Sequence, residues 1–110
     1  MQNDLSVRNE ANNLVEIVKN FWGQNVSEIK IENLTDVPYE LFVLTMKLYN
    51  YYHILMEYDR STLSIKVKTE NEYITLSRLT NQKVFRGFES YELKNLLHNF
   101  KVLDHILHNQ

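Results

Sequence analysis

The chain has 110 residues, of which 44% are hydrophobic and 24% charged, and its formal net charge at pH 7 is −2. A chain of this length has room for one hydrophobic core, so we expect a single globular domain over residues 1–110. The absence of cysteine excludes disulfide scaffolds, thiolate zinc sites and cysteine nucleophiles. The two glycines, Gly23 and Gly87, stand far apart, which argues against glycine-rich loops that bind phosphate.

The sequence predicts a cytoplasmic protein that does not span a membrane. No run reaches the roughly 18 consecutive apolar residues that a membrane-spanning helix requires. The N-terminal residues Met1 to Asp4 lack the charged and then apolar pattern of a secretory signal. The nearly neutral net charge gives no general attraction to nucleic acid, so nucleic acid is disfavoured as a partner.

The first predicted element is an amphipathic helix over about residues 4–22. Its apolar residues follow the helical spacing of three and four, from Val7 and Ala11 through Leu14 and Val18 to Trp22. Gly23 then ends the helix, because glycine adopts the left-handed cap conformation readily. Beyond it, Ile29 and Ile31 alternate with charged residues, which predicts a short strand with one wet face.

A second helix is predicted to start at Asp36-Val37-Pro38 and to run to Asn50. Aspartate can cap a helix, and proline is tolerated in its first turn. The apolar residues of the 40–50 segment form two adjacent helical rows, so most sides of this helix would need cover from the domain or from another chain. A buried strand is the alternative, because periodicity alone does not separate a short apolar run in a helix from one in a strand.

Residues 51–77 are predicted to form a meander of three strands. A turn at Glu70-Asn71 would place Val67 opposite Ile74, Ile65 opposite Leu76, Lys68 opposite Tyr73 and Lys66 opposite Thr75. A turn at Asp59-Arg60 would place Met56 beside Leu63 and Ile54 beside Ile65. The alternative extends the second helix through Tyr58, because residues 51–58 do not alternate cleanly.

A final helix is predicted over about residues 89–108, with Ser90 or Glu89 as its cap. Its expected buried stripe consists of Leu93, Leu96, Leu97, Phe100, Leu103 and Leu107. The element order is then α-β-α-β-β-β-α. The sequence therefore predicts an α+β fold with helices packed on one face of an antiparallel sheet.

The non-core face of the meander is the first candidate site, as a surface that binds a partner. Tyrosine offers a large, stiff contact area with a polar tip, and charged neighbours set the orientation of a partner. Leu55 and Thr75 would share this face, which another part of the chain or a second copy could instead cover for structural reasons. The candidate partner-binding residues are Tyr51, His53, Glu57, Lys66, Lys68 and Tyr73.

Two positively charged segments are further candidates for contact with nucleic acid or an acidic partner. Arg78, Lys83 and Arg86 lie among phenylalanines, a combination that binds single-stranded nucleic acid. On the last helix, one face carries histidines and lysines and would become more positive as the pH falls, because imidazole gains a proton. The alternative is that this face is only solvated and contacts no partner. That face gathers Lys94, His98, Lys101, His105 and His108. Neither segment has the ligand spacing of a metal site.

No catalytic arrangement is predicted. The serines lack the glycine-flanked elbow of hydrolases and an identifiable base. We therefore expect neither enzymatic activity nor a cofactor, but a small protein-interaction module such as an inhibitor, an immunity or antitoxin-like factor, or an accessory protein of a bacterial phage or mobile element. The alternatives are a structural or regulatory homodimer, formed through the second helix or the sheet face, and a weak nucleic-acid-binding protein that uses residues 78–88.

Overall fold

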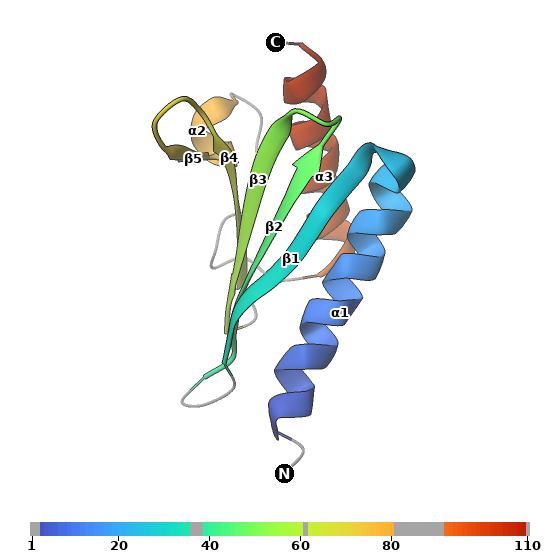
Figure 1. Ribbon diagram of the computed structural model, residues 1–110, viewed down its shortest axis with the longest axis vertical. Coiled ribbons are helices and arrows are strands. Elements are labelled where there is room, and N and C mark those ends of the chain that lie inside the picture. The colour runs from blue at the N-terminus through green and yellow to red at the C-terminus, as the bar shows by residue number, and fades with distance from the viewer. Residues whose placement is uncertain (1–2, 36–38, 61, 81–91, 110) are drawn as a thin grey trace.

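The structure is a computed structural model, and it describes residues 3–35, 39–60, 62–80 and 92–109. It is an α+β domain built on a five-stranded antiparallel sheet. The predicted α+β class is confirmed, whereas the predicted element order is wrong, because a strand stands in place of the second helix and a short helix follows the last strand. The sheet is a meander in which each strand pairs with the next along the chain (Figure 1). The elements are α1 (Asn3–Trp22), a 3-10 turn (Gly23–Asn25), β1 (Val26–Thr35), β2 (Leu41–Leu48), β3 (Tyr52–Asp59), β4 (Thr62–Lys68), β5 (Tyr73–Thr75), α2 (Leu76–Leu79) and α3 (Leu93–His108).

The first helix and the strand after it are confirmed. α1 ends at Trp22, and Gly23 has φ +59°, the left-handed conformation expected of the residue that ends the helix. β1 follows after one short 3-10 turn and contains Ile29 and Ile31. β1 is also an edge of the sheet, and positive φ angles at Glu28 and Asn33 coincide with two shifts in its pairing with β2. Such bulges make an edge strand a poor template for another chain.

The predicted second helix is wrong, because the segment forms the strand β2. Every second residue of this strand is buried, from Phe42 to Leu48, and the residues between them are half-buried. β2 lies inside the sheet between β1 and β3, so apolar residues such as Val43 occur on both of its faces. This two-sided apolar pattern resembles a buried helix in the sequence. The predicted helix start at residues 36–38 lies outside the described residues.

The predicted meander is confirmed, and its second hairpin has the expected pairs of Val67 with Ile74 and of Lys68 with Tyr73. Lys66 pairs with Thr75, whereas Leu76, expected in this strand, begins α2. In the first hairpin the pairing is displaced, since Asp59 pairs with Thr62.

The displacement in the first hairpin changes the partners but not the faces. Met56 pairs with Ile65, not with the predicted Leu63, and Ile54 pairs with Val67, not with Ile65. The turn lies one residue later than predicted, so the register moves by two positions and each side chain keeps its face of the sheet. The alternative in which a helix runs through Tyr58 is wrong, because these residues form β3.

The hydrophobic core lies between one face of the sheet and the two long helices, α1 and α3 (Figure 1). Phe100 of α3 packs against Phe21 and Trp22 at the end of α1, with ring centroids 5.5 and 4.7 Å apart. The buried stripe of α3 differs from the prediction at its start, where Leu93 is 57% exposed and Asn95 is buried. α3 begins only at Leu93, and the predicted caps at residues 89 and 90 lie outside the described residues.

Candidate functional site: the open face of the sheet

The sheet has a second face, on which neither α1 nor α3 lies. Its side chains alternate with the buried ones along each strand and are half-buried or exposed. We call this surface the open face. It consists of Lys30, Glu32, Leu41, Val43, Thr45, Lys47, His53, Leu55, Glu57, Asp59, Thr62, Ser64, Lys66, Lys68 and Tyr73.

The strand pairing sorts the charged residues of the open face by sign along the strands. One end of the face carries carboxylates, because Glu32 and Glu57 both pair with Val43, and Asp59 pairs with Leu41. We call this the acidic end. The opposite, basic end carries Lys30, Lys47, Lys66 and Lys68. Between the two ends, Val43 and Leu55 give the face an apolar centre.

Ion pairs neutralise part of this charge. Lys66 Nζ lies 2.8 Å from Glu57 Oε1, which joins the two ends on neighbouring strands. Lys47 Nζ lies 3.4 Å from Glu28 Oε2. At the far acidic end, the Arg60 side chain contacts the Asp59 carboxylate at 2.6 Å. These groups are partly exposed, so the pairs fix side-chain orientation more than they stabilise the fold.

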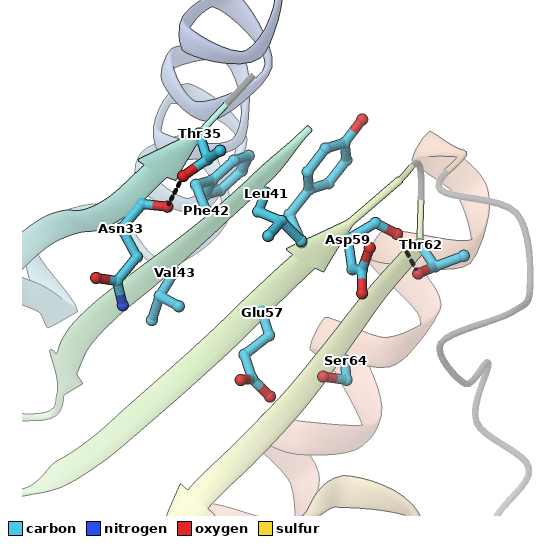
Figure 2. A pocket seen from close by; sticks show the side chains of 10 residues that line it. Asn33, Thr35, Leu41, Phe42, Val43, Glu57, Asp59, Thr62 and Ser64 are labelled. Atoms are coloured by element: carbon cyan, nitrogen blue, oxygen red, sulfur yellow. Dashed lines mark hydrogen bonds between the residues drawn. The ribbon is translucent and has the colours of Figure 1, made fainter. Parts of the chain in front are cut away.

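The acidic end contains a hollow of about 460 Å³. Figure 2 shows the Glu57 and Asp59 carboxylates beside the hydroxyl groups of Thr62 and Ser64 on this side of the sheet. Thr62 Oγ1 donates a hydrogen bond to the backbone carbonyl of Asp59 at 2.6 Å. Leu41 and Val43 line the same hollow, so its lining combines carboxylates with apolar side chains.

A second hollow, of about 480 Å³, lies at the basic end, where the sheet meets the end of α3. Its lining includes His53 and Lys68 of the open face, and Leu107 of α3. Tyr51 also lines it and is 73% exposed, with its ring edge-on to Tyr52 at 4.8 Å. The Tyr52 hydroxyl donates to the Leu107 carbonyl at 3.2 Å, which fixes the inner tyrosine and leaves the outer one accessible.

The structure brings most of the predicted partner-binding residues together. His53, Glu57, Lys66, Lys68 and Tyr73 all lie on the open face, and Tyr73 is 38% exposed. Tyr51 lies in the turn before β3 and borders the basic end through the hollow. Four further residues of the open face were not predicted from the sequence. A helix in place of β2 hides the neighbours of Lys30, Glu32 and Lys47. Asp59 was predicted to lie in the turn, which begins one residue later.

The described residues of the predicted positive segments belong to other surfaces. Arg78 is exposed in the short helix α2, and Lys83 and Arg86 lie outside the described residues. The last helix presents its positive residues to solvent on the side of the sheet opposite the open face. These exposed residues are Lys94, His98, Lys101, His105 and His108.

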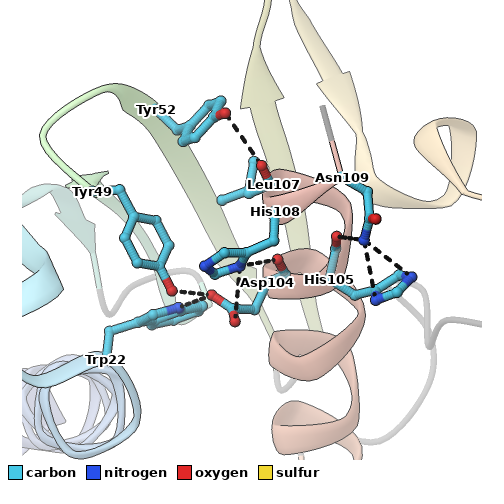
Figure 3. Close-up of polar contacts among 8 residues, drawn as sticks. All are labelled: Trp22, Tyr49, Tyr52, Asp104, His105, Leu107, His108 and Asn109. Atoms are coloured by element: carbon cyan, nitrogen blue, oxygen red, sulfur yellow. Dashed lines mark hydrogen bonds and ion pairs between the residues drawn. The ribbon is translucent and has the colours of Figure 1, made fainter.

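A polar cluster around Asp104 was not predicted from the sequence. Trp22 Nε1 donates to Asp104 Oδ1 at 2.9 Å, and the Tyr49 hydroxyl donates to the same oxygen. His108 Nδ1 donates to the backbone carbonyl of Asp104 at 2.9 Å and lies 3.4 Å from its carboxylate (Figure 3). Burial, with a smaller contribution from the Asp104 hydrogen bond and charge, raises the pKa of Tyr49 to about 12. The cluster holds α1, α3 and the β2–β3 turn together.

Among the described residues, no group of three or more histidine, aspartate or glutamate side chains is arranged to hold a metal ion. Nor does that part of the chain contain a helix of the length and apolar character needed to cross a membrane. Comparison with models of protein families, with curated proteins and with solved structures finds no match to the chain.

Proposed function

We propose that this protein is a small binding module that acts on another protein through the open face. The observation that carries the proposal is the sorting of charge on that face, with carboxylates at one end, lysines at the other and Val43 and Leu55 between them. A surface of this kind fixes the orientation of a partner and rejects one with the opposite charge order.

The rigidity of the face supports the same function. Its side chains stand on paired strands whose opposite face is packed into the core by α1 and α3. A surface that is held in place before binding loses little conformational entropy when a partner docks. Lys66 and Glu57 are already oriented by their mutual contact, and Tyr51 and Tyr73 add exposed aromatic area at the basic end. Tyrosines of this kind are frequent anchors in protein interfaces.

The activity that follows is inhibition or neutralisation of a cytoplasmic partner by surface complementarity, without turnover or a cofactor. An inhibitor or immunity-like protein of this size needs only a stiff, specific surface. The carboxylates of the acidic end would face basic groups of the partner, and the lysines of the basic end would face acidic groups.

Affinity capture with matched variants tests the proposal. Lys68→Glu and Tyr73→Ala alter the open face at exposed positions, whereas Lys101→Glu makes the same charge change on α3. We expect wild type and Lys101→Glu to capture the same partner from the native host, and the two open-face variants to lose it while their thermal midpoints stay within about 2 °C, because surface substitutions change stability little. Equal capture by all four proteins would remove the open face as the binding site.

A further inference from the structure

The order of charge on the open face also specifies which partner geometry it fits. We infer that the open face binds the open face of a second copy of this chain, with the strands of the two copies running in opposite directions. This inference rests on the proposed function, since it uses the same surface. It names the occupant that the charge order favours.

A symmetric dimer requires a surface that is complementary to itself. Two sheets stacked face to face can be related by a twofold axis that runs along the strands or across them. An axis along the strands would place the acidic end of one copy over the acidic end of the other. An axis across the strands places the acidic end of each copy over the basic end of the other, so the two ends attract each other in both halves of the interface.

The strand pairing gives the expected contacts for an axis across the strands. Glu32 and Lys30 lie two positions apart in β1, opposite Val43 and Thr45 of β2. Residues that pair across the strands form a row, so Glu32 and Val43 lie in one row and Lys30 and Thr45 in the next. A rotation by 180° about an axis between these two rows places Glu32 above Lys30 of the second copy. On β3 the same operation brings Asp59 above His53. The apolar side chains of Val43 and Leu55 lie in the two rows beside the axis, above Thr45 and Glu57 of the second copy.

The size of the face sets the strength of the dimer. Four strands about 4.8 Å apart and about seven residues long, at about 3.3 Å per residue, span roughly 400–500 Å² per copy. Stable interfaces bury about 800 Å² per partner. The ion pair between Lys66 and Glu57 also neutralises part of the charge within one copy, so this part does not attract the second copy. The dimer is therefore weak and concentration-dependent, and salt weakens it.

Sedimentation of the full chain over a range of concentrations tests this inference. We expect wild type to move from monomer to dimer with concentration, and the dimer to weaken at least about tenfold between ionic strengths of about 0.01 M and 1 M, where the Debye length falls from about 30 Å to about 3 Å. The double variant Lys94→Glu/Lys101→Glu, on α3, is the matched control and should dimerise as wild type does. Wild type that stays monomeric at low salt would overturn the inference.

Charge-swapped variants test the arrangement of the two copies. Glu32→Lys/Asp59→Lys leaves Glu57 as the only carboxylate of the open face and gives the face a strong basic excess. Lys30→Glu/Lys68→Glu gives it an acidic excess, with Lys47 and Lys66 retained. Each should be monomeric alone, whereas an equimolar mixture should form a heterodimer. A mixture that stays monomeric contradicts pairing of the two faces.

The absence of cysteine allows the axis to be located with single-cysteine variants and a short thiol cross-linker. Leu55→Cys, near the axis, should cross-link to itself. Thr62→Cys, at the acidic end, should not, but it should cross-link to Lys68→Cys when the two are mixed. Efficient self-cross-linking of Thr62→Cys would show the axis along the strands and overturn the inferred orientation.

The two proposals fail separately. If wild type is monomeric throughout and Lys68→Glu abolishes capture of a different protein, the second-copy inference is overturned and the proposed function stands. If the dimer forms and the charge-swapped mixture restores it, but no other protein depends on the open face, the open face serves self-association and the proposed inhibition of a partner is removed.

Discussion

The hydroxyl of Tyr49 donates a hydrogen bond to the carboxylate of Asp104, although the two residues lie 55 positions apart in the chain. Tyr49 belongs to the turn between β2 and β3, and its backbone N–H donates to the Asn25 carbonyl at 2.7 Å. Asp104 also accepts from Trp22 at the end of α1. One carboxylate therefore joins the turn, the first helix and the last helix at one end of the domain.

Removing this carboxylate should destabilise the fold. Asp104→Ala leaves the partly buried Trp22 N–H and Tyr49 hydroxyl without an acceptor, and we expect a loss of about 1–3 kcal/mol in the free energy of unfolding. Asp104→Asn keeps one acceptor oxygen and should lose less. Urea denaturation measures both, with Glu70→Ala at an exposed turn as the control. A change below about 0.5 kcal/mol for Asp104→Ala would show that the cluster is not structural.

The raised pKa of Tyr49 predicts a loss of stability in alkali. Burial, and then the hydrogen bond to Asp104, favour the neutral phenol in the folded protein, where the pKa is about 12 against about 10 for the unfolded chain. Above about pH 10 the unfolded state releases a proton that the folded state keeps, so stability falls as the pH rises from about 10 to 12. Below about pH 10 the contribution of Tyr49 is constant.

Ultraviolet titration of tyrosinate measures this pKa. The chain has seven tyrosines, so the difference between wild type and Tyr49→Phe isolates the group. We expect the difference curve to be centred near pH 12, and Asp104→Asn to lower the pKa of that component. A difference curve centred near pH 10 would contradict the raised pKa.

The two faces of β2 should respond differently to truncation. Leu44 is fully buried under the helices, and Val43 is half-buried on the open face. Leu44→Ala should cost about 2–5 kcal/mol because it leaves a cavity in the core, whereas Val43→Ala should cost less than about 1.5 kcal/mol. Chemical denaturation of the two variants makes the comparison. Equal losses would argue against the alternation that defines this strand.

The same strand explains how far the sequence predicted the fold. Strands with one apolar and one polar face, such as β4, have a clear period of two, and their faces were predicted even where the register of the β3–β4 hairpin moved by two positions. β2 was missed because an interior strand with Leu41 and Val43 on its open side has no clean polar alternation. Hydrogen bonds to neighbouring strands decide whether such a segment forms a strand or a helix. The local sequence does not show which segments become those neighbours.

The candidate site was predicted in part for the same reason. His53, Glu57, Lys66 and Lys68 follow from alternation within β3 and β4. The ordering of charge by sign depends on β1 and β2 lying beside them, and pairing across four strands is a tertiary property. The Asp104 cluster was outside the reach of sequence analysis, because its contacts join residues 55 and 82 positions apart.

The turn between β2 and β3 should tolerate glycine and resist β-branched residues. Tyr49 and Asn50 have φ angles of +55° and +56°, the mirror-image turn that suits the twist of a hairpin. Asparagine accepts this conformation, whereas valine is strained there by about 1–2 kcal/mol. Asn50 is exposed, so its replacement changes little besides the backbone preference. Thermal unfolding should therefore show Asn50→Gly within about 0.5 kcal/mol of wild type and Asn50→Val clearly destabilised. Equal stability of these two variants would mean that the turn adopts an ordinary negative φ at this position.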